Sequence, residues 1–176
     1  MKKILVIYPD WNVTKIALFE GENKLLEKII THDKTILLTY ESIIDQFNYR
    51  KKQVIHSLNQ LCISINELDA IAARGGVLSP MPSGTYIVNE TIVDYLRTKS
   101  PIEHPANLGA LIAFDLSETS NKKPPVFMTD PLSVDEFVPE ARIAGVPQLE
   151  RISRYNALNM KTVARYASNK LKKDYW

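Results

Sequence analysis

Three segments of the chain place polar residues directly after short apolar runs, where such residues can handle an anion. Residues 9–15 follow the run Ile4–Ile7, Arg74-Gly75-Gly76 follows Leu68–Ala73, and Asp130 follows Val126–Thr129. Ligands of open α/β sheets bind at the ends of buried strands. The three segments therefore predict one shared site at the edge of a sheet.

The residue types in these segments suit a phosphate or a carboxylate. A glycine pair lets the backbone approach a ligand closely, and Arg74 beside it offers a planar fork of donors for an oxyanion. Asp130 at a strand end can orient a nucleophile or hold a magnesium ion. Arg-Gly-Gly and Asp-Pro sequences also form ordinary turns, but the three segments together indicate anion handling.

His104 and Asn107 precede a predicted helix and are further candidates, because the N-terminus of a helix attracts anions. The same two side chains could instead cap that helix, and their spacing does not choose between the two roles. His32 and His56 have no metal-like spacing with each other or with Cys62, so no metal cluster is predicted. The chain has neither a Walker-type phosphate loop nor a Gly-x-Ser-x-Gly elbow.

Composition sets limits on the class of protein. The 176 residues are 45% hydrophobic and 24% charged, as in an ordinary soluble globular domain. Lys plus Arg is 22 and Asp plus Glu is 20, for a net charge of +2, which argues against a nucleic-acid or membrane partner. The apolar run after Met1 is too short for an export signal, so a cytoplasmic location is expected. Cys62 has no cysteine to pair with and is expected to be a buried or half-buried thiol.

The elements that would position the site follow from hydrophobic patterning. Three strands are expected first, at Ile4–Ile7, Val13–Glu20 and Leu25–Thr31, joined antiparallel by short turns. The remaining elements are a helix over Thr39–Cys62, a strand over Leu68–Ala73, a constrained loop over Leu78–Thr85, a helix from Asn89 or Thr91 to Leu96, a helix from Pro105 to Ser117, a strand over Val126–Thr129 and a helix from Ser153 or Asn156 to Leu171. This order predicts an α/β layer domain.

The order of these segments resembles the butyrate kinases, within the acetate kinase family of carboxylate kinases. The segments that carry the resemblance are Ile4–Ile7 with Thr14–Ala17, Asp45–Phe47 with Arg50-Lys51, Glu67–Gly76, Pro82–Asn89, His104–Ala113, Thr129–Pro131, and Ala157–Asn159 with Lys161 and Val163–Arg165. The resemblance implies a ribonuclease-H-like (actin-like ATPase) fold with a mixed sheet and flanking helices. It covers only the amino-terminal half of the family. Residues 1–150 would form the kinase domain, and 151–176 a helix that begins the missing second domain.

The resemblance also implies roles for residues. Family members move the terminal phosphoryl group of ATP, with magnesium, to a short-chain carboxylate. Arg74 would hold the carboxylate or the phosphoryl group, with His104, Asn107, Gly75 and Gly76 lining the same site. Asp130 would position the acid or the magnesium, and no direct metal ligand is predicted beyond it. Thr14 and Lys15 would be the remains of the family's first phosphate loop.

The sequence departs from the family at that loop and at one later position. Asp10, Trp11 and Val13 replace the glycine and small hydroxyl residues of the family loop. An aspartate repels phosphate, and a tryptophan fills the space that a glycine leaves for a ligand. Asn156 replaces a histidine, and asparagine cannot carry the positive charge that would stabilise a transferring phosphoryl group.

Several functions are compatible with this sequence. The leading hypothesis is a truncated, degenerate butyrate kinase relative without activity as a lone chain, either as a homodimer or with a second chain that supplies the missing half. The alternative is a non-catalytic module that binds a small carboxylate or phosphate at Arg74, or a protein partner. A decayed product with no selected function is a third possibility.

Overall fold

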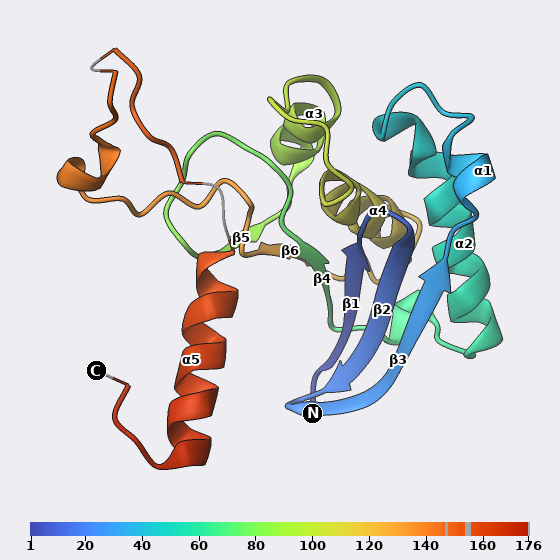
Figure 1. Cartoon of the computed structure of the whole chain (residues 1–176). Helices are drawn as coiled ribbons and strands as arrows, with labels where there is room; N and C mark the ends of the chain where they lie inside the picture. Colours follow the sequence, from blue (N-terminus) through green and yellow to red (C-terminus); the bar gives the residue numbers. More distant parts are fainter. Residues whose placement is uncertain (147, 154–155, 176) are drawn as a thin grey trace.

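One mixed β-sheet forms the centre of the protein (Figure 1). The computed structural model describes residues 1–146, 148–153 and 156–175. In the described residues the sheet has the order β3-β2-β1-β4-β6-β5, with β1 (Lys3–Pro9), β2 (Val13–Glu20), β3 (Asn23–Thr31), β4 (Ala70–Arg74), β5 (Thr85–Ile87) and β6 (Val126–Thr129). β1, β2 and β3 pair antiparallel, as predicted. β4 is parallel to both β1 and β6, and β5 is antiparallel to β6.

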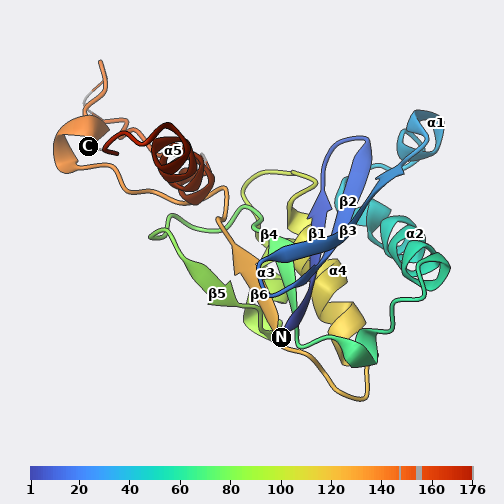
Figure 2. The ribbon, with the colours of Figure 1, turned by 90° about the horizontal axis from the view of Figure 1, so that it is seen from below.

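Alternation along the first two strands decides which face of the sheet is buried. Leu5, Ile7, Ile16 and Leu18 face the core and are buried, since successive side chains of a strand point to opposite faces. Helices α2 (Phe47–Gln60) and α4 (Asn107–Glu118) pack against this inner face, and α3 (Glu90–Thr98) packs against α4 (Figure 2). The outer face carries the alternate side chains, such as Val6, Tyr8, Ala17 and Phe19, which stay half-buried.

The helix expected over Thr39–Cys62 is shorter than predicted. Ser42 forms a turn with Asp45, whose carboxylate accepts hydrogen bonds from the Ser42 backbone N–H and hydroxyl. Such local bonds compete with helix formation, so a 3-10 turn (Ile44–Gln46) precedes α2. The chain leaves the helix after Gln60, and Cys62 has a positive φ of 55°. Cys62 is exposed, so the prediction of a buried or half-buried thiol was wrong.

Other element boundaries differ by less. Sequence patterning missed the short helix α1 (Lys34–Leu37) and the strand β5, which lies at the end of the expected loop. Asn89 caps α3, since its Oδ1 accepts a hydrogen bond from the Ile92 N–H. The last helix, α5 (Ala157–Leu171), begins after Asn156. None of the described helices is long and apolar enough to cross a membrane.

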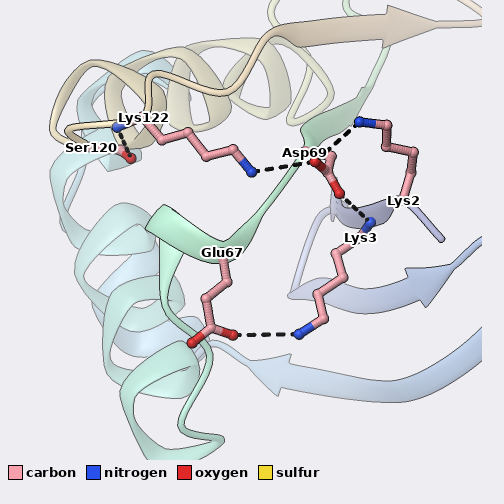
Figure 3. Close-up of polar contacts among 6 residues, drawn as sticks. All are labelled: Lys2, Lys3, Glu67, Asp69, Ser120 and Lys122. Carbon is pink, nitrogen blue, oxygen red and sulfur yellow. Dashed lines mark hydrogen bonds and ion pairs between the residues drawn. The ribbon is translucent and has the colours of Figure 1, made fainter.

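A charged cluster fixes the amino ends of β1 and β4, at the opposite end of these strands from Arg74 (Figure 3). The Asp69 carboxylate accepts a hydrogen bond from the Lys3 backbone N–H at 2.9 Å and pairs with the ammonium groups of Lys2 and Lys122. The backbone hydrogen bond, with smaller contributions from both lysines, lowers the pKa of Asp69 to about 2. These contacts join β1, β4 and the connection that leads to β6, so the cluster is structural.

In the part of the carboxyl-terminal region that the structure describes, α5 and the segment before it make little contact with the sheet (Figures 1 and 2). Residues 135–153 include a 3-10 turn (Pro139–Arg142) and lead to α5. Several large apolar side chains of this part of the chain are exposed: Val138, Ile143, Val146, Leu149, Ile152, Met160, Val163, Tyr166 and Leu171. Single exposed apolar residues are normal, but Met160, Val163 and Leu171 of α5 are spaced as one helical face.

Candidate functional site

Arg74, the last residue of β4, lies where the sheet meets the β1–β2 loop. Its guanidinium stacks on the ring of Tyr8, with Cζ 4.4 Å from the ring centroid, and Nη1 donates to the Pro9 carbonyl at 3.1 Å. The side chain is only 11% exposed. Its Nε is buried and has no hydrogen-bond partner among the described residues. A cation held in this way, with a donor unused, can recognise an oxyanion.

Asp10 lies beside Arg74 in the β1–β2 loop. Its Oδ1 is 3.7 Å from Arg74 Nη1 and accepts a hydrogen bond from the Trp11 backbone N–H at 2.9 Å. The Trp11 ring meets the ring of His104 edge-on, with 5.4 Å between the centroids. The structure therefore brings four of the predicted residues together: Arg74, Asp10, Trp11 and His104.

His104 is held in a neutral form beside this group. Burial lowers its pKa below the usual value, the nearby Arg74 charge lowers it further, and Asp10 partly opposes the change. Its Nδ1 accepts a hydrogen bond from the Ala106 N–H, so the proton of the neutral ring is assigned to Nε2. His104 can therefore donate one hydrogen bond to a ligand, but it does not add a positive charge at neutral pH.

A buried arginine that was not among the predicted site residues, and was named only as part of the family resemblance, fixes the shape of the loop. Arg50, on the buried face of α2, is fully buried and donates to the carbonyl oxygens of Asp10 and Trp11 at 2.7 Å each. It also donates to the Val13 carbonyl at 3.4 Å and, through Nε, to Gln46 Oε1 at 3.0 Å. Burial lowers its pKa to about 10, so it remains charged at neutral pH.

The two residues predicted as a phosphate-loop remnant face opposite sides of the sheet, because they are neighbours on β2. Thr14 is fully buried on the inner face, and its hydroxyl lies 2.8 Å from His32 Nε2. Lys15 is exposed on the outer face, where it lines a hollow of about 330 Å³ with Tyr8 and Phe19. The structure does not bring this pair to the Arg74 group as one binding element.

Asp130 lies at the end of β6 and holds the start of α5. Its Oδ1 accepts the Leu158 N–H at 3.1 Å, and its Oδ2 accepts the Asn159 N–H at 3.0 Å. The residue has a positive φ of 51°, which aspartate tolerates better than most residues. A cavity of about 370 Å³ opens between α5 and the sheet, and its lining includes Arg74, Asp130 and Asn156.

Gly75, Gly76 and Asn107 have clear packing roles. A Cβ on Gly75 would lie 2.4 Å from Cα of Pro131, and one on Gly76 would lie 2.8 Å from Asn107 Oδ1. The Asn107 side chain accepts the Val77 N–H and donates to Ser100 Oγ and to a backbone carbonyl. Gly75 lets the Arg74 segment pack against Pro131, Gly76 and Asn107 hold that segment against α4, and the Asn107 amide does not cap the helix.

The family resemblance implies that the β1–β2 loop binds a nucleotide phosphate, but the structure of the loop does not fit one. The Trp11 N–H is bonded to the Asp10 carboxylate, and the Asp10 N–H is bonded to the Val13 carbonyl. The carboxylate itself would repel a phosphate. Both oxygens of Asp130 are engaged by α5, and no group of three His, Cys, Asp or Glu side chains in the described part of the chain is placed to hold a metal ion.

Comparison with known structures defines the class of fold. Porphyromonas gingivalis acetate kinase matches 99% of this chain and 50% of its own, with a TM-score of 0.62 and 16% identity. Entamoeba histolytica acetate kinase matches 96% of this chain and 46% of its own, with a TM-score of 0.60 and 14% identity. The fold is therefore the actin-like ATPase fold of the acetate kinases, as the sequence predicted.

Sequence comparison finds relatives that are similar to nearly the whole chain. A probable butyrate kinase from Thermotoga petrophila and another from Thermotoga maritima are each 44% identical over 173 residues, which is 98% of this chain. The chain spans about half the length of these relatives, 48% in each case. No protein-family model matches the chain. The chain is therefore similar, over nearly its whole length, to about half of each of these probable butyrate kinases, and their amino-terminal half fits these matches.

Proposed function

We propose that this chain is the amino-terminal half of a carboxylate kinase and does not complete phosphoryl transfer alone. The family reaction converts ATP and a short-chain carboxylate into ADP and an acyl phosphate. In this proposal residues 1–150 form the first kinase domain, and 151–176 begin the second. The observation that carries it is the half-length match to butyrate kinases, combined with the half-buried Arg74 beside a cavity of about 370 Å³.

Arg74 is the residue we assign to the substrate carboxylate or to the phosphoryl group. Its charge is largely shielded from water, which strengthens its attraction for an oxyanion. Phosphoryl transfer depends on such positioning and charge compensation more than on covalent chemistry. His104 would donate a hydrogen bond from Nε2. Asn156 lines the same cavity and cannot supply a charge to the reaction.

ATP and magnesium would need a complementary half, because the β1–β2 loop of this chain does not offer its N–H groups to phosphate. Calorimetry should detect no binding of Mg-ATP to the lone chain at millimolar concentration, with or without butyrate. The decisive experiment adds the part of the Thermotoga petrophila relative that this chain does not match, and assays acyl phosphate formation. Activity in the mixture that disappears with Arg74→Met supports the proposal. Micromolar Mg-ATP binding by the lone chain would contradict it.

An interaction module is the second candidate, and the exposed apolar side chains of α5 favour it. Such a module would bind a protein partner, or a small anion at Arg74, without Mg-ATP. A partner bound equally well by wild-type protein and by the Arg74→Met variant would favour the module over the kinase half. A decayed product would bind neither nucleotide nor partner and would be marginally stable.

A further inference from the structure

The β1–β2 loop is held rigidly even though its side chains no longer suit phosphate. Arg50 donates hydrogen bonds to the carbonyl oxygens of Asp10, Trp11 and Val13. The His32 backbone N–H donates to the Asn12 carbonyl at 2.9 Å. Every carbonyl from residue 10 to residue 13 is therefore bonded to the scaffold. Because these carbonyl oxygens, which would repel an anion, all point towards the interior, the opposite side of the loop is organised to receive an anion.

The Asp10 carboxylate has the contacts that an external oxyanion would make there. Asp10 Oδ1 accepts a hydrogen bond from the Trp11 backbone N–H at 2.9 Å and pairs with Arg74 Nη1 at 3.7 Å. Its side chain is 40% exposed, so it lies at the mouth of the site and not in the core. The pairing is loose, and Arg74 keeps its buried Nε without a partner among the described residues.

We propose that Arg74 and the β1–β2 loop form a latent oxyanion site that Asp10 occupies as a built-in competitor. Removal of the carboxylate exposes the site to inorganic phosphate or to a short carboxylate, which share the negatively charged oxygens that Arg74 recognises. The inference rests on the proposed function for the role of Arg74, but it concerns the lone chain and needs neither nucleotide nor a second half.

The test compares binding of inorganic phosphate and of butyrate to Asp10→Asn, Asp10→Gly and the parent protein. Trp11 lies against the site and provides a fluorescence signal, so all variants carry Trp176→Phe, which leaves a single tryptophan in the sequence. Both Asp10 variants should bind phosphate at least about tenfold tighter than the parent, because one charge repulsion is gone. The phosphate and butyrate arms show which oxyanion the exposed site prefers.

Two controls separate this site from a general effect of charge. Glu22→Gln removes one exposed carboxylate in the β2–β3 turn and should leave phosphate binding unchanged. Arg74→Met combined with Asp10→Asn should abolish the gain. Equal tightening by Glu22→Gln, or no gain in either Asp10 variant, would overturn the proposal. If Asp10→Asn does not fold, Asp10→Gly carries the same test, since glycine stands in this loop in the family that the chain resembles.

The outcome is independent of the test of the proposed function. Phosphate binding in the Asp10 variants without any activity in the half-chain mixture would leave the latent site in place and remove the kinase proposal. Activity in the mixture without tighter phosphate binding by the Asp10 variants would support the kinase proposal and remove the latent site.

Discussion

At the scale of single residues, Arg50 and His32 are buried ionisable groups whose effects on stability can be measured. Arg50 brings a full charge into the core and is tolerated there because three carbonyls and Gln46 accept its hydrogen bonds. Sequence patterning did not select it, because an arginine in a helix is normally solvated. One signal was available: Arg50 falls three residues after Phe47 and four before Val54, on the buried face of α2.

Replacement of Arg50 by methionine should lower the free energy of unfolding by about 2 kcal/mol, roughly 1 kcal/mol each for the Asp10 and Trp11 carbonyls, which lose their donor; the Val13 carbonyl keeps the Asp10 N–H. Arg50→Lys should recover part of the loss, since its ammonium keeps the charge and up to three donors. Urea unfolding measures both. The control is Arg97→Met, an exposed arginine whose guanidinium lies over the Phe47 ring, with an expected loss below about 1 kcal/mol. Equal losses for the two methionine variants would contradict the role given to Arg50.

His32 predicts a pH dependence of stability. Burial, with a smaller contribution from the Arg50 charge, lowers its pKa from 6.5 to about 4. Because the folded pKa is the lower one, the fold favours the neutral ring. The stabilisation is complete above pH 6.5 and is lost as the pH falls towards 4. A shift of this size corresponds to about 3 kcal/mol.

Urea unfolding of the wild-type protein at pH 7, 6, 5 and 4 should show this loss, and the His32→Asn variant should show a flatter profile. His56→Asn is the matched control, an exposed histidine on α2 whose variant should follow the wild-type profile. The Asp69 carboxylate also loses its stabilising effect in acid, but only as the pH falls below 3.8 towards 2, which is outside this window. Parallel profiles for wild type and His32→Asn would show that the buried ring is not responsible.

At the scale of elements, patterning located most strands and helices but not the points where local hydrogen bonds intervene. The four apolar residues Ile4–Ile7 and the alternation of Val13–Glu20 identify β1 and β2, because burial of one sheet face imposes those patterns. The predicted start of α2 was too early, because the Ser42–Asp45 turn precedes the helix. Its hydrogen bonds leave no trace in the hydrophobic pattern of the sequence. β5, at three residues, is too short to show a period.

The carboxylate of Asp130 caps the start of α5 by accepting two of its backbone N–H groups. No residue of α5 whose side chain is described is buried, so the helix depends strongly on its end. Asp130→Gly removes both acceptors yet suits the positive φ. The amides of Leu158 and Asn159 should then lose hydrogen-exchange protection, with α5 destabilised by about 1 kcal/mol.

Asp130→Asn keeps one acceptor and should retain most of that protection. Asn89→Ala, which removes the cap of α3, should leave the amides of α5 unchanged. Unaltered exchange at Leu158 and Asn159 in the glycine variant would mean that the carboxylate does not hold the helix.

At the scale of the whole molecule, the carboxyl-terminal part differs from the rest of the chain. The sheet and its three helices bury an ordinary core, whereas α5 carries an apolar stripe of Met160, Val163, Ala164, Ala167 and Leu171, spaced as one helical face. Met160 is 56% exposed, Val163 57% and Leu171 65%. The sequence showed this period but not that the stripe lies open, because exposure depends on what the rest of the chain leaves uncovered.

The stripe gives the last prediction, that α5 is the surface on which the second half of the kinase fold docks. This chain matches 48% of each relative, so each relative has an unmatched part of comparable length that could cover such a stripe. Val163→Glu should weaken binding of the unmatched part of the Thermotoga petrophila relative at least tenfold, because it places a charge in an apolar contact. Thr162→Glu adds the same charge one residue away, on the opposite face of α5, and should bind like the wild type. Light scattering and calorimetry would measure the two affinities, and equal weakening by both variants would show that charge alone, and not the apolar stripe, governs the contact.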